Sequence, residues 1–350
     1  MELVRTHSSV NRPLAPLCSI CIAHFRGHEL IAECIESVLA QNCDFSFEII
    51  VHDDASPDDS VAFMLSQYPQ IEVLESKENV GFCVANNRMV EYARGKYVLL
   101  LNNDAALFPD ALSTLADSAE NSEETGILTL PQYDWESGEL VDRGCLLDPF
   151  YNPVPNLDPE RTEVAMVIGA CLWIRRETWQ DLGGFPEWFE SIAEDLYLCC
   201  LLRLGGKKVG VTNLSGYRHK QGTSFGGNRA TEKGLSTTYR RRYLSERNKT
   251  YVLILAQPKV LLLPALTLHI AFLLAEGLIL SAFARNLNPI RKIYWPALAS
   301  VFYERKSLAH RRLRIQQART CRWRNYGEVF TVVPRKLQLI AGHGIPKIEY

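Results

Sequence analysis

The sequence lacks an overall excess of charge of either sign, since 38 Lys and Arg residues stand against 40 Asp and Glu residues. The distribution is uneven, however. Residues 285–350 hold 14 Lys and Arg and 3 Asp and Glu, a net charge of +11, which leaves −13 on the other 284 residues. A basic segment beside an acidic body is explained either by a solvated helical face or by an anionic partner. Nucleic acid would satisfy the charge alone, but a neighbouring apolar segment favours a phospholipid surface.

Several catalytic and targeting motifs are also missing. No GxGxxG follows the first predicted strand, residues 17–25, which argues against a Rossmann oxidoreductase. The stretch IAHFRGHEL is a poor match to the Gly-rich basic loop of a nucleotidyltransferase. No Ser-His-Asp or Cys-His set indicates a nucleophile on the protein. Residues 1–16 lack the apolar core of a signal peptide, so we expect a flexible N-terminal tail there.

The ten cysteines do not form a disulfide pattern. Most lie in apolar runs, as Cys171 and the pair Cys199–Cys200 do, where a thiol behaves as a small hydrophobic group. Cys18 and Cys21 have CxxC spacing, but they fall in a predicted strand, where positions i and i+3 point to opposite faces. We therefore expect a reducing compartment and no metal or redox role for this pair.

The first 250 residues alternate between apolar runs and helical periodicity. The composition, 47% hydrophobic and 22% charged, is typical of a globular protein with a large core. Strands are predicted at 17–25, 47–56, 71–76, 96–104, 126–134 and 207–212, and helices at 27–41, 79–95 and from about 194. Because strands alternate with helices, we predict an α/β domain over residues 17–250 with a mostly parallel sheet.

Residues 260–283, VLLLPALTLHIAFLLAEGLILSAF, form a long apolar segment with a single carboxylate, Glu276. The segment is long enough to cross a bilayer. Glu276 and Pro264 argue against a simple span, so a spanning helix, an interfacial helix and a buried helix stay open. Together with a basic helix expected at about 300–324, it makes residues 251–350 a predicted membrane-associating helical region.

Acidic residues stand at the ends of predicted elements. Asp53 and Asp54 end the second strand, Asp104 ends the fourth, and Glu194 and Asp195 open a later helix. Turn formation or helix capping could explain each position alone. Ligands bind at the carboxyl ends of parallel strands, however, so we expect one shared site. Transfer from a nucleoside diphosphate needs such a set: ligands for a divalent cation, a base for an acceptor hydroxyl, and an acceptor for a pyrimidine imide N–H.

Four segments in order resemble family 2 glycosyltransferases with the GT-A fold, and most closely their bacterial rhamnosyltransferase branch. The segments are VHDDASPDDS, ENVGFCVANN, YVLLLNNDAALFP and GACLWIRRETWQDLGGFPEWFESIAEDLYLCCLLRLGGKKV. The HxxGxS segment His219–Ser224 and the later Glu246-Arg247-Asn248 also match that branch. The resemblance covers about residues 17–250. It implies a Rossmann-like nucleotide-diphospho-sugar transferase domain, followed by the hydrophobic and basic helical segment that such proteins often carry.

The resemblance also implies a donor site. Asp53 would accept the imide N–H of uracil or thymine. Other residues would line the base pocket or form the loop over the nucleoside: Ala23, Phe25, Asn79, Gly81 and Phe82.

A metal site would adjoin the donor. Asn102-Asn103-Asp104 stands where the family often has DxD, so Asn103 would contact the donor and Asp104 would hold Mg²⁺ or Mn²⁺. Asn at the first position predicts a weaker metal site. His219 would be a second ligand or a phosphate contact.

For catalysis, the resemblance implies that Asp195 is the general base of a single inverting displacement. Glu194 would orient this base or the acceptor. Trp188 and Phe189 would stack on an acceptor sugar, although packing in the core is an equally open role for Phe189.

The sequence therefore predicts an inverting glycosyltransferase that acts on a lipid-linked or polysaccharide acceptor in bacterial surface glycan synthesis. Its donor would be dTDP-rhamnose or a UDP-sugar. Its place would be the cytoplasmic face of the inner membrane, as a peripheral or single-span protein without a nucleic-acid partner. A non-catalytic membrane-associated nucleotide-sugar-binding protein and a nucleotidyltransferase are the alternatives.

Overall fold

The computed structural model describes residues 4–220, 222, 227–231, 234–344 and 347–349. Its centre is a nine-stranded sheet in the order β1-β4-β3-β2-β5-β13-β7-β14-β12. The strands are β1 Val4–His7, β2 Cys18–His24, β3 Phe47–Asp53, β4 Glu72–Ser76, β5 Tyr97–Asn102, β7 Thr125–Thr129, β12 Glu163–Val164, β13 Cys171–Arg175 and β14 Lys208–Val211. β4, β3, β2 and β5 run parallel, whereas β1, β12 and β13 pair antiparallel.

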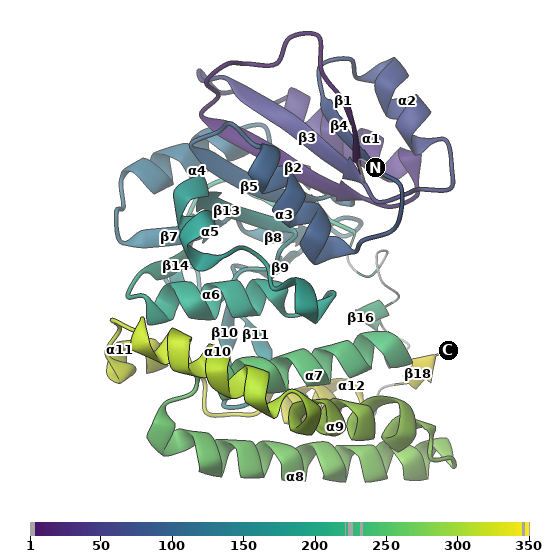
Figure 1. The fold of residues 1–350 in the computed structure, drawn as a ribbon, viewed down its shortest axis with the longest axis vertical. Coiled ribbons are helices and arrows are strands. Elements are labelled where there is room, and N and C mark those ends of the chain that lie inside the picture. Colours follow the sequence, from purple (N-terminus) through teal and green to yellow (C-terminus); the bar gives the residue numbers. More distant parts are fainter. Residues whose placement is uncertain (1–3, 221, 223–226, 232–233, 345–346, 350) are drawn as a thin grey trace.

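Helices bury both faces of this sheet (Figure 1). The helices are α1 His28–Leu39, α2 Ser60–Gln67, α3 Phe82–Tyr92, α4 Ala111–Glu120, α5 Arg176–Leu182 and α6 Glu194–Leu204. Successive residues of β2 point to opposite faces: Ile20 packs in one core cluster with α1, α2 and α4, and Cys21 packs in another with α3, α5 and α6. Two buried faces explain why the strands are continuous apolar runs rather than alternating ones.

Smaller sheets extend this unit. β6 Ala105–Leu107, β15 Tyr217–His219, β8 Gln132–Asp134 and β9 Leu140–Asp142 form a second sheet. β6 begins three residues after β5 ends, so the second sheet starts at the carboxyl edge of the first. The remaining short elements are β10 Cys145–Leu147, β11 Pro153–Pro155, β16 Gly227–Thr231, β17 Gly234–Thr238, β18 Lys347–Glu349 and the 3-10 helix η1 Glu187–Phe189.

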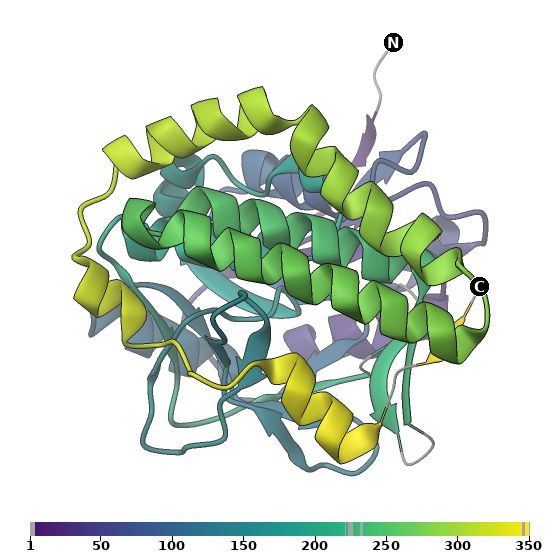
Figure 2. The same ribbon diagram turned by 90° about the horizontal axis from the view of Figure 1, so that it is seen from below.

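A layer of helices lies under α6, with α8 outermost (Figures 1 and 2). The elements are α7 Tyr239–Ala256, α8 Lys259–Ala284, the π-helix η2 Ile290–Tyr294, α9 Trp295–Tyr303, α10 Arg305–Gln317, α11 Trp323–Gly327 and α12 Arg335–His343. α7 packs against α6 on one side and against α8, α9 and α10 on others. It therefore joins the sheet domain to the C-terminal helices.

The predicted α/β fold is confirmed, but the central sheet is mixed rather than mostly parallel, with four parallel and four antiparallel strand pairs. Two local expectations also differ. Residues 4–7 of the expected flexible tail form β1, which pairs with residues 73–76 of β4 and covers the edge of the sheet. The basic helix expected at about 300–324 is divided, because α9 ends at Tyr303, α10 ends at Gln317 and α11 begins at Trp323.

Candidate active site

The carboxyl ends of three neighbouring strands form one edge of the site. In the sheet register His24 of β2 lies opposite Asp53 of β3, and Ala23 lies opposite Asn102 of β5. Asp104 follows β5 by two residues. Asp53 and Asp104, about 50 positions apart in the chain, are therefore brought to the same edge, as the sequence predicted.

The adjacent acids Asp53 and Asp54 have different partners. Both oxygens of Asp54 accept backbone N–H groups, from Val80 at 2.7 Å and Gly81 at 2.9 Å. Asp53 is 1% exposed; its Oδ1 accepts from the Ser56 N–H at 3.0 Å, whereas its buried Oδ2 has no partner among the described residues. Asp54 thus fixes the 79–81 loop, and Asp53 keeps a buried acceptor available for a ligand N–H.

A cavity of about 800 Å³ adjoins Asp53. Its walls come from β1, the 55–59 loop, α2 and the end of β4, including Ser56, Ser76 and Lys77. This volume lies in the range of small-molecule sites.

The residues predicted around the nucleoside lie near this edge with different exposures. Ala23 and Phe82 are partly buried and pack against the same core cluster. Gly81 has φ 84°, a conformation that favours glycine, at the turn into α3. Asn79 is exposed, and Phe25 is 43% exposed with the Arg26 guanidinium 4.8 Å from its ring.

His24 is a site residue that the sequence analysis missed. It is buried, although its sequence neighbours Ala23 and Phe25 are partly or largely exposed. Its Nδ1 lies 3.0 Å from the amide nitrogen of Asn103. Burial lowers the pKa of His24, which favours the neutral ring. Because Asn103 donates to Nδ1, the proton sits on Nε2, a buried atom with no partner among the described residues. A polar residue ending an otherwise apolar strand was the available signal.

Asp104 and His219 meet where the two sheets join. β6 and β15 pair so that His219 lies opposite Ala105, and His219 Nε2 is 3.1 Å from Asp104 Oδ1. On the other side of the ring, Nδ1 lies 3.3 Å from Gln132 Oε1, which also accepts from the Tyr217 hydroxyl at 2.7 Å.

These donors fit a divalent cation. A carboxylate and an imidazole suit Mn²⁺, and an Nδ1–H bond to Gln132 would turn Nε2 toward Asp104. Within the described ranges no cluster of three or more His, Cys, Asp or Glu residues gathers for a metal. The remaining ligands of such an ion would therefore be diphosphate oxygens and water. In the predicted HxxGxS motif, Ser224 lies outside the described residues.

Glu194 and Asp195 begin α6 close to the same edge. Asp195 accepts from the Gly169 N–H at 3.0 Å through Oδ2 and from the Leu196 N–H at 2.7 Å through Oδ1. The next residue, Ala170, accepts the N–H of Asn102 at the end of β5. The segment 169–170 therefore ties this acid pair to the strand that leads to Asp104.

Burial gives both acids of this pair a higher pKa than acids on the protein surface have. It raises the pKa of Glu194 to about 8, and repulsion from Asp195 adds to the effect. Burial also raises the pKa of Asp195, while the N–H groups of Gly169 and Leu196 stabilise its charged form. The pair therefore holds a proton at neutral pH, and the hydrogen bonds favour Glu194 as its carrier.

The loop before this pair has an unusual backbone held from α7. Glu190, Ile192 and Ala193 have φ of 66°, 70° and 69°, which is costly for residues with a Cβ. The buried Asn248 amide nitrogen donates to three carbonyls of this loop, those of Phe189, Ser191 and Ile192, at 3.1, 2.9 and 2.7 Å.

Arg247 adds two more bonds to the same loop. Its guanidinium donates to the Phe189 carbonyl at 2.8 Å and to the Glu190 carboxylate at 2.9 Å. The sequence motif Glu246-Arg247-Asn248 was noticed without a role. The structure places its last two residues under the loop that carries the acid pair.

Of the two aromatic residues predicted to bind an acceptor, Phe189 is fully packed, whereas Trp188 stays partly exposed. Phe189 is 0% exposed, which contradicts stacking on a sugar and supports its packing role. Trp188 is partly buried beside Tyr251, with the Arg311 guanidinium 4.5 Å from its ring.

Parts of this chain are similar in sequence to known glycosyltransferases. Chondroitin synthase of Escherichia coli is 28% identical over 188 residues, 52% of this chain and 26% of that protein. The N-acetylglucosaminyl-diphospho-decaprenol L-rhamnosyltransferase of Mycobacterium tuberculosis is 24% identical over 180 residues, 43% of this chain and 59% of that protein. The chain spans between 24% and 35% of the length of three curated relatives that it matches, of which the chondroitin synthase is one.

Solved structures share the fold at low identity. GalNAc-T7 with UDP, GalNAc and Mn²⁺ has a TM-score of 0.54 at 15% identity, covering 69% of this chain and 48% of that one. The mannosyltransferase PcManGT of Pyrobaculum calidifontis, in complex with GDP-Man and Mn²⁺, has a TM-score of 0.50 at 16% identity, covering 87% and 86%. The family model described as glycosyl transferase family 2 matches residues 19–183. Residues 19–183 are therefore similar to glycosyltransferase family 2, and the fold of the chain is the GT-A fold of these solved structures.

Proposed function

We propose that this protein is an inverting glycosyltransferase that moves a sugar from a nucleoside diphosphate to a hydroxyl group. The observation that carries the proposal is the set of acids at one sheet edge, each in a different environment. Asp53 has an unpaired buried oxygen, Asp104 faces an imidazole, and Glu194 and Asp195 hold a proton between them. Binding alone would not require the last pair.

The proposed donor is dTDP-rhamnose or a UDP-sugar. Asp53 Oδ2 is an acceptor without a donor, and the imide N–H of uracil or thymine is a donor of the matching kind. The mycobacterial relative, by its name an L-rhamnosyltransferase, supports rhamnose as the sugar.

Asp104 and His219 would hold Mg²⁺ or Mn²⁺ beside the diphosphate. Two GT-A neighbours were solved with Mn²⁺. When bound, the ion would neutralise charge on the leaving diphosphate.

Asp195 would act as the general base. Its carboxylate takes the proton of the acceptor hydroxyl as that oxygen bonds to the anomeric carbon, and the bond from this carbon to the phosphate oxygen breaks. The nucleoside diphosphate leaves with the bonding electrons. One displacement inverts the anomeric configuration, and protonated Glu194 can donate a hydrogen bond to the acceptor or to Asp195.

The acceptor is proposed to be lipid-linked or a growing polysaccharide of a bacterial surface glycan. The relatives named as chondroitin synthase and decaprenol-linked rhamnosyltransferase support this class. The cytoplasmic face of the inner membrane is the proposed place of action, since the C-terminal region contains one helix that by length and composition could cross a membrane.

Slow hydrolysis of the donor tests the reaction without knowledge of the acceptor. UDP-sugars and dTDP-rhamnose would be incubated with the full chain and Mn²⁺, and the released sugar followed by NMR. We expect the first sugar released to have the anomeric configuration opposite to that of the donor. Retained configuration would contradict inversion, and nucleotide binding without hydrolysis or transfer would favour the binding-protein alternative.

Replacing Asp53 by Asn should change base preference. The variant keeps an oxygen for the Ser56 N–H but presents an NH₂ group where Oδ2 stood. We expect affinity for UDP and dTDP to fall about tenfold, because one hydrogen bond is lost and the imide N–H then faces another donor. CDP, whose ring nitrogen accepts, should bind relatively better. Calorimetric titration of the three nucleotides measures this, and an unchanged order of affinities would remove Asp53 from the base site.

Replacing Asp104 by Ala should abolish the effect of metal on donor binding. Wild type is expected to bind UDP more tightly with Mn²⁺ than without it, because the metal joins protein and diphosphate, and the variant is expected to bind equally weakly in both. Thermal shift with and without Mn²⁺ is the measurement. Asp142→Asn is the matched control, since Asp142 is a buried acid of the same sheet that accepts the Gly144 N–H. A normal response to Mn²⁺ in the Asp104 variant would show that Asp104 does not bind the metal ion.

A further inference from the structure

Helix α8 has an outer surface made of large apolar side chains. Leu263, Leu268, Phe272, Leu278, Ile279 and Phe283 are between 45% and 75% exposed. Figure 2 shows that no other helix covers this side of α8. A continuous apolar helix face of this size marks an interaction surface rather than a surface made for water.

Two ionisable residues of the same helix, Glu276 and His269, face the protein. Glu276, the single charged residue between Lys259 and Arg285, pairs with Arg242 of α7 and with Lys336 of α12, the latter at 2.6 Å. His269 lies 2.8 Å from the hydroxyl of Thr250 on α7. The inner side of α8 therefore holds Glu276 and His269 beside the buried Leu273 and Leu280, and its exposed surface is largely apolar.

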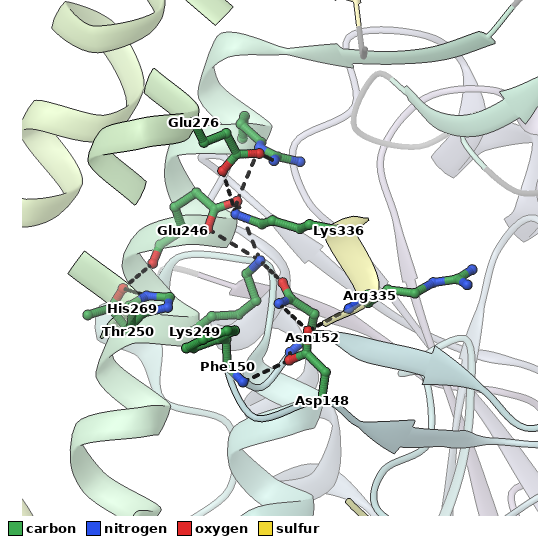
Figure 3. Close-up of polar contacts among 11 residues, drawn as sticks. Asp148, Phe150, Asn152, Glu246, Lys249, Thr250, His269, Glu276, Arg335 and Lys336 are labelled. Carbon is green, nitrogen blue, oxygen red and sulfur yellow. Dashed lines mark hydrogen bonds and ion pairs between the residues drawn. The ribbon is translucent and has the colours of Figure 1, made fainter. Parts of the chain in front are cut away.

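Buried ion pairs continue from α8 into the sheet domain (Figure 3). Lys336 also pairs with Glu246 at 2.9 Å, and Lys249 donates to Asn152 at 2.6 Å. Asn152 in turn donates to Asp148 at 2.9 Å. Moving α8 away from α7 would leave these buried charges without partners, which is strongly unfavourable. A helix fixed in this way cannot turn to cross a bilayer while the domain keeps its fold.

The orientation of α8 suits a membrane surface. It lies along the outside of the helical layer, next to α7 (Figures 1 and 2). Its 26 residues correspond to roughly 39 Å at 1.5 Å per residue. A helix that is held along the outside of a domain and exposes apolar side chains along its length can bind with its axis in the plane of the lipid interface.

The charge next to this helix favours lipid over a second copy of the chain. Residues 285–350 carry the net charge of +11, and Arg285, Arg291 and Lys292, just after α8, are exposed. Two copies that met through this region would bring like charges together, whereas an anionic bilayer attracts them. Trp295 of α9 is 67% exposed, and Trp favours the lipid interface.

We propose that α8 lies in the plane of an anionic membrane, with its outer face among the acyl chains and the basic residues after it among the headgroups. The protein is then monotopic, with both ends of α8 on one side of the bilayer. This inference deepens the proposed function by naming the partner of the C-terminal helices. Its test reads membrane binding alone, so its failure would leave the transfer reaction standing.

Flotation of the full chain with vesicles tests the lipid partner. We expect flotation with phosphatidylcholine vesicles that contain about 30% phosphatidylglycerol and much less with pure phosphatidylcholine. The triple variant Leu268→Ser, Phe272→Ser, Ile279→Ser should lose at least about tenfold in bound fraction, since three buried side chains are lost from the lipid. The matched control is Leu14→Ser, Leu157→Ser, Leu214→Ser, which removes exposed leucines of the sheet domain and should float as wild type does.

Flotation that stays the same in the α8 variant would overturn the proposal. So would a chain that stays unbound and forms dimers which the α8 substitutions dissociate, as measured by analytical ultracentrifugation.

Labelling of the two helix ends tests the orientation. Lys259→Cys and Asn286→Cys place single thiols at exposed positions on either end of α8. The background would carry Cys43→Ser and Cys321→Ser, the cysteines that are not fully buried. In expressing bacteria, a membrane-impermeant maleimide should label neither position in intact cells and both in inverted vesicles. Labelling of one end from outside the cell would show a spanning helix and overturn the monotopic arrangement.

Discussion

The Asp195→Asn variant is expected to lose about 10³-fold in kcat, within the range that a positioned base contributes. An amide cannot take the proton of the acceptor hydroxyl at any pH used for catalysis. The side chain keeps its shape, and its oxygen can still accept one of the N–H bonds from Gly169 and Leu196. Affinity for the nucleotide should therefore stay close to that of wild type, because the Asp53 cavity belongs to other elements.

Glu194→Gln is the matched control for this variant. Burial holds Glu194 protonated at neutral pH, with a pKa of about 8, and Gln resembles that neutral acid. We expect kcat within about threefold of wild type at pH 7, since no charge is removed. Loss of turnover in both variants would show that Glu194 and Asp195 act as one unit. Normal turnover in Asp195→Asn would exclude Asp195 as the base.

The same control predicts a pH dependence of stability. The folded state raises the pKa of Glu194 from its ordinary value to about 8, so between these values the native chain binds more protons than the unfolded chain. Stability from this group is present at low pH and is lost as pH rises through about 8. The Tm of Glu194→Gln relative to wild type should therefore increase from pH 5 to pH 8.5, as calorimetry would show. If the difference in Tm between Glu194→Gln and wild type did not change with pH, the pKa of Glu194 would not be the raised one.

The sequence predicts the strands well because their chemistry is local. The runs within residues 17–25 and 96–104 are largely apolar and short, as expected for strands of a sheet covered on both faces. Parallel order follows from the intervening helices. The acids at the strand ends were found for the same reason, since parallel strands share one carboxyl edge. The β1 pairing was missed because residues 1–16 carry no apolar pattern, and β4 supplies the partner.

Roles within the site depend on contacts that no local pattern contains. Asp53 and Asp54 are the same residue type in neighbouring positions, and they differ only because the 79–81 loop folds onto Asp54. In the sequence, Phe189 and Trp188 are equally good candidates for stacking on a ligand. In the structure both rings contact Tyr251 of α7, and Arg311 of α10 lies over Trp188, but only Phe189 is fully buried. Glu276 looks like an obstacle to membrane binding in the sequence. Its partners on α7 and α12, about 34 and 60 positions away, make it the inner side of an interfacial helix.

Asn248→Asp is expected to lower kcat about 10²-fold through the position of Asp195, since small misplacements of a catalytic group have effects of this size. The substitution replaces an NH₂ donor by a carboxylate that would face the carbonyls of Phe189, Ser191 and Ile192. Those bonds hold Ile192 and Ala193 at positive φ, directly before the acid pair. The loop is then expected to relax toward ordinary backbone angles and to carry Asp195 away from the acceptor.

Thr250→Val on the same helix separates this effect from a general loss of stability. Thr250 is as buried as Asn248, but its hydroxyl faces His269 of α8 and the Glu246 carbonyl. Both variants remove a buried hydrogen-bond donor from α7, and both should lower Tm. Only Asn248→Asp should lower kcat, while both keep the Kd for UDP, because among the described residues none from α7 lines the cavity beside Asp53. Equal losses of kcat in the two variants would mean that α7 supports the fold as a whole, and a weakened UDP affinity in Asn248→Asp would mean that the loop also shapes the donor site.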